Sequence, residues 1–218
     1  PTIINTNDIN QVITHTYHNQ TTDVSPYILP LKATTAFGCE NTTSSTIYAY
    51  PEVTARYSFD QGNAACSPFT VGLNSGATTN GYFYQWDFDD GTNSNLKSPS
   101  HRFVNITEND KIFDVHLTSI SAYDCEDDTT MPLTVYATPV ANFSVNPPLQ
   151  VFPNATFNFH NQSSPAADSW NYSWTFGDGY SSVLKEAGDH TYTHWAPKTS
   201  GYIYTAKLKV EAPHCSDT

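Results

Sequence analysis

Apolar and polar residues alternate with a period of two along most of the chain, which is the pattern of half-buried β-strands. In one segment Tyr84, Trp86 and Phe88 fall on one face, and Gln85 and Asp87 fall on the other. The same alternation occurs in 69–73, 113–117, 157–159, 172–176 and 202–210. No segment of helical length shows a 3.6-residue period. Many short strands separated by turn residues predict an all-β fold of immunoglobulin-like sandwiches, each with two antiparallel sheets.

Three motifs recur along the chain and indicate a repeated module of about 88 residues. They are an aromatic turn ending in Asp-Gly, a His followed two residues later by an aromatic residue, and a cysteine after that pair. The turn occupies 84–91 and 172–179, the pair begins at His15, His101 and His190, and the cysteines are Cys39, Cys125 and Cys215. Residues that recur in each copy are expected to build the module rather than to catalyse a reaction.

The boundaries between modules are predicted at two prolines, Pro51 and Pro139, which have the same spacing as the motifs. Residues 1–50 then hold the second half of a module, 51–138 a complete module, and 139–218 a module that lacks its last strand. Linkers of essentially one proline, with no Gly/Ser-rich tether, predict closely coupled modules that form a semi-rigid rod.

Composition narrows the range of partners. The 218 residues carry a net charge of −12, and the resulting negative field disfavours binding to nucleic acid and to anionic membrane surfaces. The sequence has no run of eighteen apolar residues, so membrane insertion is not expected. Abundant Thr, Asn, Ser and Tyr with a single Met favour an extracellular or cell-surface location. Asn-x-Ser/Thr triplets are common by chance in such a chain, so glycosylation stays open; they begin at Asn19, Asn41, Asn105, Asn154, Asn161 and Asn171.

The turn motifs resemble those of the PKD family of immunoglobulin-like sandwiches. The family signature Trp-Asp-Phe-Gly-Asp-Gly is matched by 86–91 and 174–179, and its late strand, Gly-x-Tyr-x-Val-x-Leu-x-Val, by 201–210. Asp89 stands where the family has Gly, Thr175 where it has Asp, and Lys111 where it has Gly. The modules have a Cys after the long late strand, followed by Ser-Asp-Thr at 216–218. In this they resemble the PKD arrays in very large secreted surface proteins of gliding Bacteroidota. That resemblance implies an adhesin or surface-filament segment.

The expected function is therefore a non-catalytic extracellular spacer or stalk within a multi-PKD cell-surface protein, displaying or forming an adhesive filament. Its partners would be neighbouring modules of the same chain and surface glycans or other adhesion targets. No nucleophile, zinc-protease or phosphate-binding motif occurs in the sequence. Two alternatives remain open: a carbohydrate- or protein-binding accessory module of a secreted hydrolase, and a subunit of a surface layer or sheath.

Most candidate site residues are assigned structural roles. Trp86 and Trp174 lie mid-strand and are expected in the core. Trp170 and Trp195 do not recur and lie beside turn residues, so they are candidates for ligand contact. The recurring residues expected to hold the turn are His15, His101, His190, Asp178, Gly91 and Gly179.

The acidic turn of the middle module is a candidate calcium site, because Asp87, Asp89 and Asp90 bring three carboxylates close together. Aspartates in turns more often accept hydrogen bonds from their own backbone amides, which is the competing interpretation. No other cofactor is expected.

The cysteines suggest a link between modules. In an immunoglobulin-like sandwich, Cys66 and Cys125 would lie at opposite ends, about 26 Å apart for an eight-residue strand, which is too far for a disulfide. The late hairpin of the next module would lie beside Cys66, so we predict an interdomain Cys66–Cys215 bond. Cys39 and Cys125 would pair with cysteines outside this sequence. Four free thiols remain the alternative.

Overall fold

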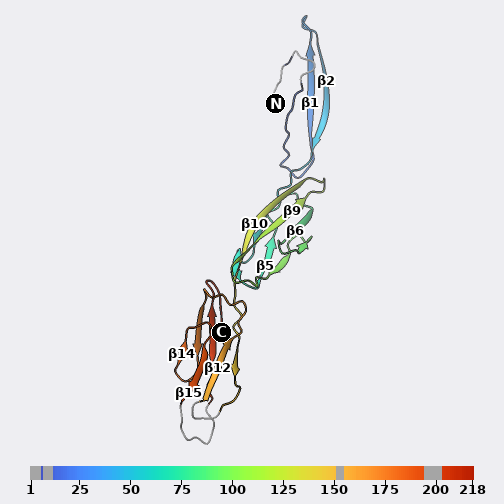
Figure 1. The fold of residues 1–218 in the computed structure, drawn as a ribbon. Coiled ribbons are helices and arrows are strands. Elements are labelled where there is room, and N and C mark those ends of the chain that lie inside the picture. Colours follow the sequence, from blue (N-terminus) through green and yellow to red (C-terminus); the bar gives the residue numbers. More distant parts are fainter. Residues whose placement is uncertain (1–5, 7–11, 151–154, 194–202) are drawn as a thin grey trace.

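The computed structural model describes residue 6 and residues 12–150, 155–193 and 203–218. These residues form strands and loops only, as the alternation predicted, and the fold class is confirmed. Figure 1 shows three parts that follow one another along an elongated molecule: an N-terminal hairpin, a middle sandwich and a C-terminal sandwich.

The middle sandwich packs a three-stranded sheet, in the order β3-β5-β8, against a five-stranded sheet, in the order β4-β10-β9-β6-β7. Its strands are β3 (Ser58–Phe59), β4 (Ala64–Cys66), β5 (Phe69–Asn74), β6 (Phe83–Asp87), β7 (Asn93–Ser94), β8 (Ser100–Phe103), β9 (Lys111–Ile120) and β10 (Glu126–Tyr136). Along β5 and β6 buried residues alternate with more exposed ones. The alternation therefore places one side of each strand in the core between the sheets.

The C-terminal sandwich has the same two-layer plan, with sheets in the orders β11-β12-β15 and β14-β13-β16-β17. Its strands are β11 (Phe143–Asn146), β12 (Ala155–Asn161), β13 (Asn171–Thr175), β14 (Ser181–Ser182), β15 (Gly188–Tyr192), β16 (Lys207–Glu211) and β17 (Ser216–Asp217). Its core is separate from that of the middle sandwich and begins at Ala137, directly after β10. Because the second core begins at the residue after β10, the connection between the two sandwiches is short and keeps them close together.

The N-terminal part has one antiparallel hairpin among its described residues, formed by β1 (Ser25–Thr34) and β2 (Glu40–Ala49). Its register corresponds to that of β9 and β10: Tyr27 faces Ile47 as Phe113 faces Leu133. Most of its side chains are exposed. In the part of the chain that the structure describes, the hairpin therefore has the strand pairing of a sandwich but no facing sheet.

Candidate functional site: the junction between the two sandwiches

The tryptophans of the repeated turn are core residues, as predicted. Trp86 is 2 % exposed and Trp174 is fully buried. Each indole Nε1–H donates to a backbone carbonyl ten residues further on, at 2.9 Å to Leu96 and 3.0 Å to Leu184. Burial and a satisfied indole give these side chains a structural role, because no face of the ring is free for a ligand.

The His of each complete motif clamps its own turn. His101 Nε2 lies 2.7 Å from Asp90 Oδ2, and His190 Nε2 lies 2.7 Å from Asp178 Oδ2. A carboxylate can only accept, so Nε2 carries the hydrogen in both pairs. His101 also stacks on Phe88, with ring centroids 4.1 Å apart. The arrangement ties the turn to the strand that carries the His, β8 or β15.

His15 lacks such a clamp. It is exposed, and within the described part of the chain no ion pair to it is found. Its ring meets the edge of Tyr17 at 4.4 Å, as His101 meets Phe103 at 4.6 Å. Among the described residues, the His of the N-terminal copy thus keeps the contact with its aromatic neighbour but not the clamp.

The two turn glycines adopt the conformation that the motif requires. Gly91 has φ +85° and Gly179 has φ +97°, in a region that side chains with a Cβ rarely occupy. The structural role expected for them follows from this backbone conformation.

The acidic turn does not gather its carboxylates around one point. Asp87 accepts from the amide of Asp89 at 2.9 Å, Asp89 accepts from the amide of Asp114 at 3.1 Å, and Asp90 binds His101 and Thr92. Among the described residues, no group of three or more His, Cys, Asp or Glu side chains could hold a metal ion. The calcium prediction therefore has no geometric support at this turn.

The two tryptophans predicted to contact a ligand are Trp170 and Trp195, and the structure describes only the first. Trp170 is 6 % exposed and lies in the C-terminal core, so the prediction that it contacts a ligand is wrong. The amide of Trp170 donates to the carbonyl of Ala167 at 3.2 Å, so the residue ends a turn. Trp195 lies outside the described residues.

A shallow polar hollow of about 340 Å³ lies on the outer face of the middle sandwich. Carboxylate, amide, imidazole and hydroxyl groups line it, from Gln85, Asp87, Asn93, Asn95, His116 and Thr118. These groups offer hydrogen bonds to a polar ligand, but the one aromatic residue at the hollow, Trp86, is buried. The hollow therefore has no exposed Trp, Tyr or Phe ring on which a sugar could stack.

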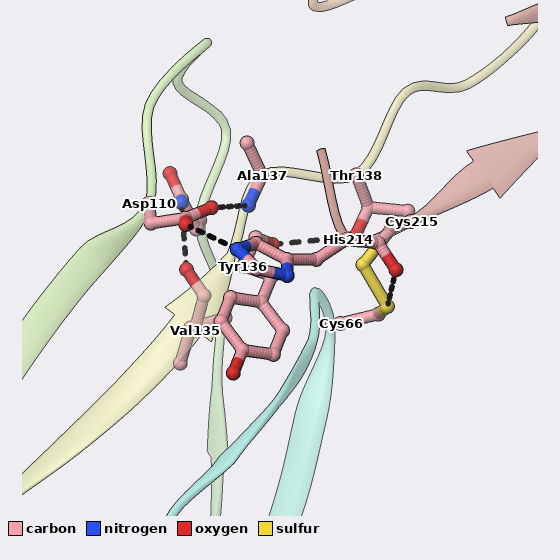
Figure 2. Close-up of a disulfide and its surroundings, with 9 residues drawn as sticks. Cys66, Asp110, Val135, Tyr136, Ala137, Thr138, His214 and Cys215 are labelled. Atoms are coloured by element: carbon pink, nitrogen blue, oxygen red, sulfur yellow. Dashed lines mark hydrogen bonds and ion pairs between the residues drawn. A yellow bond between two sulfur atoms is a disulfide. The ribbon is translucent and has the colours of Figure 1, made fainter. Parts of the chain in front are cut away.

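Figure 2 shows the junction between the two sandwiches, where a disulfide, a ring stack and an ion pair lie close together. Cys66 and Cys215 form a disulfide with their Cα atoms 6.0 Å apart, which is the pair expected from the sequence. Cys66 reaches this point because β4 runs parallel to the end of β10, where it pairs with Tyr136. The bond joins the first half of the middle sandwich to the last hairpin of the C-terminal sandwich.

Non-covalent contacts surround the disulfide. The ring of Tyr136 stacks on that of His214, with centroids 4.1 Å apart. The Asp110 carboxylate lies 3.5 Å from His214 Nε2 and accepts from the amide of Ala137 at 2.9 Å. One carboxylate therefore holds both the linker and the docked hairpin (Figure 2).

A family model for the PKD domain matches residues 136–214. A PKD domain is thus found at residues 136–214, which include most of the C-terminal sandwich. The two ends of the match, Tyr136 and His214, are the residues that stack on each other at the junction. No curated protein matches the chain.

A PKD domain indicates an extracellular, adhesion-type module, and PKD domains are generally non-catalytic. Together with the disulfide, the domain points to an extracellular location. In the described part of the chain no helix is long and apolar enough to cross a membrane.

The sequence analysis missed Tyr136, His214 and Asp110. None of them belongs to a recurring motif, and their contacts depend on how two sandwiches are placed. One signal was available, because Tyr136 corresponds to Tyr50, and Tyr50 stacks on Tyr123 at the preceding junction with centroids 4.8 Å apart. An aromatic residue at the end of the last strand of a module therefore marks a docking contact.

Proposed function

We propose that this chain is a non-catalytic spacer segment of a large cell-surface protein, in which tandem PKD modules form a stiff rod that carries an adhesive element. The observation that carries the proposal is the Cys66–Cys215 disulfide across the junction. A covalent bond between two separately cored sandwiches restricts their relative movement, and such restriction is of use to a spacer rather than to an enzyme.

The middle sandwich supports a tandem arrangement, because it repeats the contacts of the PKD domain. Tyr57 meets Trp86 edge-on with centroids 4.9 Å apart, as Phe143 meets Trp174 at 5.3 Å. Further matched pairs are the two His–Asp clamps, the two His–Phe stacks and the two indole hydrogen bonds. We therefore assign the middle sandwich to the same module type.

The disulfide also changes how the chain bears a load. Its two cysteines are 149 residues apart in sequence, so tension applied at the chain ends crosses from Cys66 to Cys215 and bypasses the residues between them. Closing a loop of this length lowers the entropy of the unfolded chain by an amount worth about 5 kcal/mol in the loop-closure model. The bond thus limits extension and stabilises both sandwiches.

Single-molecule stretching of the chain from its two ends tests this function. In the oxidised chain, unfolding should not release the loop, whereas the Cys66→Ser variant should release about 50 nm more contour length at 3.4 Å per residue. The matched control is Cys39→Ser, which removes an exposed free thiol and should extend like the wild-type chain. Equal extension of the oxidised wild-type and Cys66→Ser chains would contradict the proposal.

A second candidate function, binding of a polar ligand such as a saccharide, is favoured by the hollow beside Gln85 and His116. Glycan-array screening of the chain and of a Gln85→Ala variant tests it. Binding that the variant loses would favour an accessory binding module over a spacer.

A further inference from the structure

The N-terminal hairpin exposes a face that is buried in the middle sandwich. The inner residues of β9 and β10 are at most 1 % exposed; they are Phe113, Val115, Leu117, Leu133 and Val135. By register their counterparts in β1 and β2 are Tyr27, Leu29, Leu31, Ile47 and Ala49. Leu29 is 36 % exposed and Leu31 is 67 % exposed, whereas the other three counterparts are half-buried. An apolar strip of this kind is costly to leave in water.

The hairpin nevertheless keeps two sets of contacts that occur in the complete middle module. Tyr17 contacts Tyr27 with centroids 4.6 Å apart, as Phe103 contacts Phe113 at 5.1 Å. At its base, Asn19 Nδ2 donates to the carbonyls of Asp23 and Ala49 at 2.7 and 2.8 Å. The side chain of Asn105 makes the same pair of bonds, to Asn109 and Val135, at 2.8 and 2.9 Å. The face is therefore already shaped to receive a second sheet.

A second observation points to the same occupant. Cys125 has a free thiol at the place that corresponds to Cys215. The amide of Ser121 donates to the carbonyl of Cys125 at 2.7 Å, as Ala212 donates to Cys215 at 2.8 Å. Beside Cys125, Tyr123 stacks on Tyr50 at the end of the N-terminal part.

The junction closed by the Cys66–Cys215 disulfide shows where a partner for Cys125 would lie. Cys66 pairs with Tyr136 along the edge of β10, and Tyr136 lies against the hairpin that carries Cys215. A strand placed in the same way along the edge of β2 would bring the residue at the position of Cys66 beside Tyr50. That residue would then lie next to the hairpin that carries Cys125.

We propose that the inner face of the N-terminal hairpin docks a set of strands of the type formed by β3 to β6, and that these strands carry a cysteine at the position of Cys66 that forms a disulfide with Cys125. This inference rests on the proposed module repeat. In the bond-forming step the two thiols lose two protons and two electrons to a disulfide oxidant, which is reduced to two thiols. The proposed bond corresponds to the Cys66–Cys215 disulfide of the next junction. Each junction between consecutive modules would then be closed by one disulfide.

A peptide of residues 51–94, which contains β3 to β7 and Cys66, is a direct probe of this site. It is added to the full chain in a buffer of oxidised and reduced glutathione, and the disulfides are mapped by mass spectrometry. The expected product joins Cys66 of the peptide to Cys125 of the chain. Cys39 is an internal control, because it lies at the far end of β2, about 30 Å away for a ten-residue strand.

Two variants separate docking from random thiol exchange. Leu29→Asp in the chain places a charge on the docking face and should reduce the Cys125 product at least tenfold, while leaving Cys39 chemistry unchanged. Cys125→Ser should abolish the product and preserve non-covalent binding of the peptide. Equal coupling to Cys39 and Cys125, or a product unaffected by Leu29→Asp, would overturn the proposal.

The same peptide can also be joined ahead of residue 1 by a Gly/Ser linker, which raises its effective concentration so that weak docking is not missed. Absence of the Cys125 bond in this tethered form would overturn the proposal. Pairing of two chains through their hairpins, seen as a dimer that Leu29→Asp dissolves, would overturn it in favour of a second copy as the occupant. None of these outcomes depends on the stretching result, which concerns the bond at Cys215.

Discussion

The two sandwiches make nearly the same contacts but differ in how tightly the turn before β7 or β14 is enclosed. Asp89 and Gly177 occupy corresponding places and both have positive φ, +58° and +84°. A Cβ on Gly177 would lie 2.8 Å from the backbone N and O of Thr205. Asp89 has room for its side chain, which accepts from the amide of Asp114. The backbone conformation is thus common to the module, whereas the need for glycine is set by the segment that precedes β16.

Replacing the central tryptophan should have the largest effect of any change in this comparison. Trp86→Ala and Trp174→Ala each remove a buried indole and should lower the free energy of unfolding of their own sandwich by about 3 to 5 kcal/mol. Hydrogen exchange measured by mass spectrometry should show lost protection in β6 and β9 for the first variant, and in β13 and β16 for the second.

Equal loss of protection in both sandwiches from either variant would contradict this result. It would mean that the two cores unfold as one cooperative unit. The two sandwiches would then have no separate free energies of unfolding to compare.

Exchanging the residues of the turn should have the next largest effect, and the effect should be asymmetric. Gly177→Asp forces a side chain against the Thr205 backbone and should destabilise the C-terminal sandwich by about 2 kcal/mol or more. Asp89→Gly removes one exposed hydrogen bond and should change stability by less than about 1 kcal/mol. Urea unfolding of both variants measures the difference; similar losses would show that enclosure does not decide the residue.

The sequence predicted the features that repeat or alternate. Period-two patterning placed Trp86 and Trp174 in the core, because a strand with one buried face imposes that pattern. The ends of a sandwich are also fixed by its topology, so the sequence alone is enough to match Cys66 with Cys215.

Features that depend on one local arrangement were not predictable in this way. On the sequence Trp170 is a candidate for ligand contact, because it does not recur and lies beside turn residues, yet its side chain is buried in the core. The carboxylates of the acidic turn bind separate donors, a choice that residue spacing does not reveal. The Asp110–His214 pair joins two sandwiches, and its formation depends on their mutual placement.

The His–Asp clamps should be equivalent in the two sandwiches, and acid should weaken both. Partial burial raises the pKa of Asp90, but hydrogen bonds from Thr92 and His101 lower it more, so the pKa lies below 3.8. Burial likewise raises the pKa of Asp178, and hydrogen bonds from His190 and the Tyr180 amide outweigh it. A carboxyl whose pKa is depressed on folding stabilises the protein above its unfolded pKa and loses that contribution as pH falls through its folded pKa.

Asp90→Asn and Asp178→Asn should each cost about 1 to 2 kcal/mol at neutral pH, because each replaces a charge-assisted hydrogen bond with a neutral one. The difference from the wild-type chain should shrink in strong acid, as the pH falls through the lowered pKa values of the two carboxyls. Thermal unfolding of both variants between neutral pH and pH 2 measures this convergence. A constant difference over that range would show that the carboxylate charge does not stabilise the turn, and a loss in one sandwich alone would end the equivalence of the two clamps.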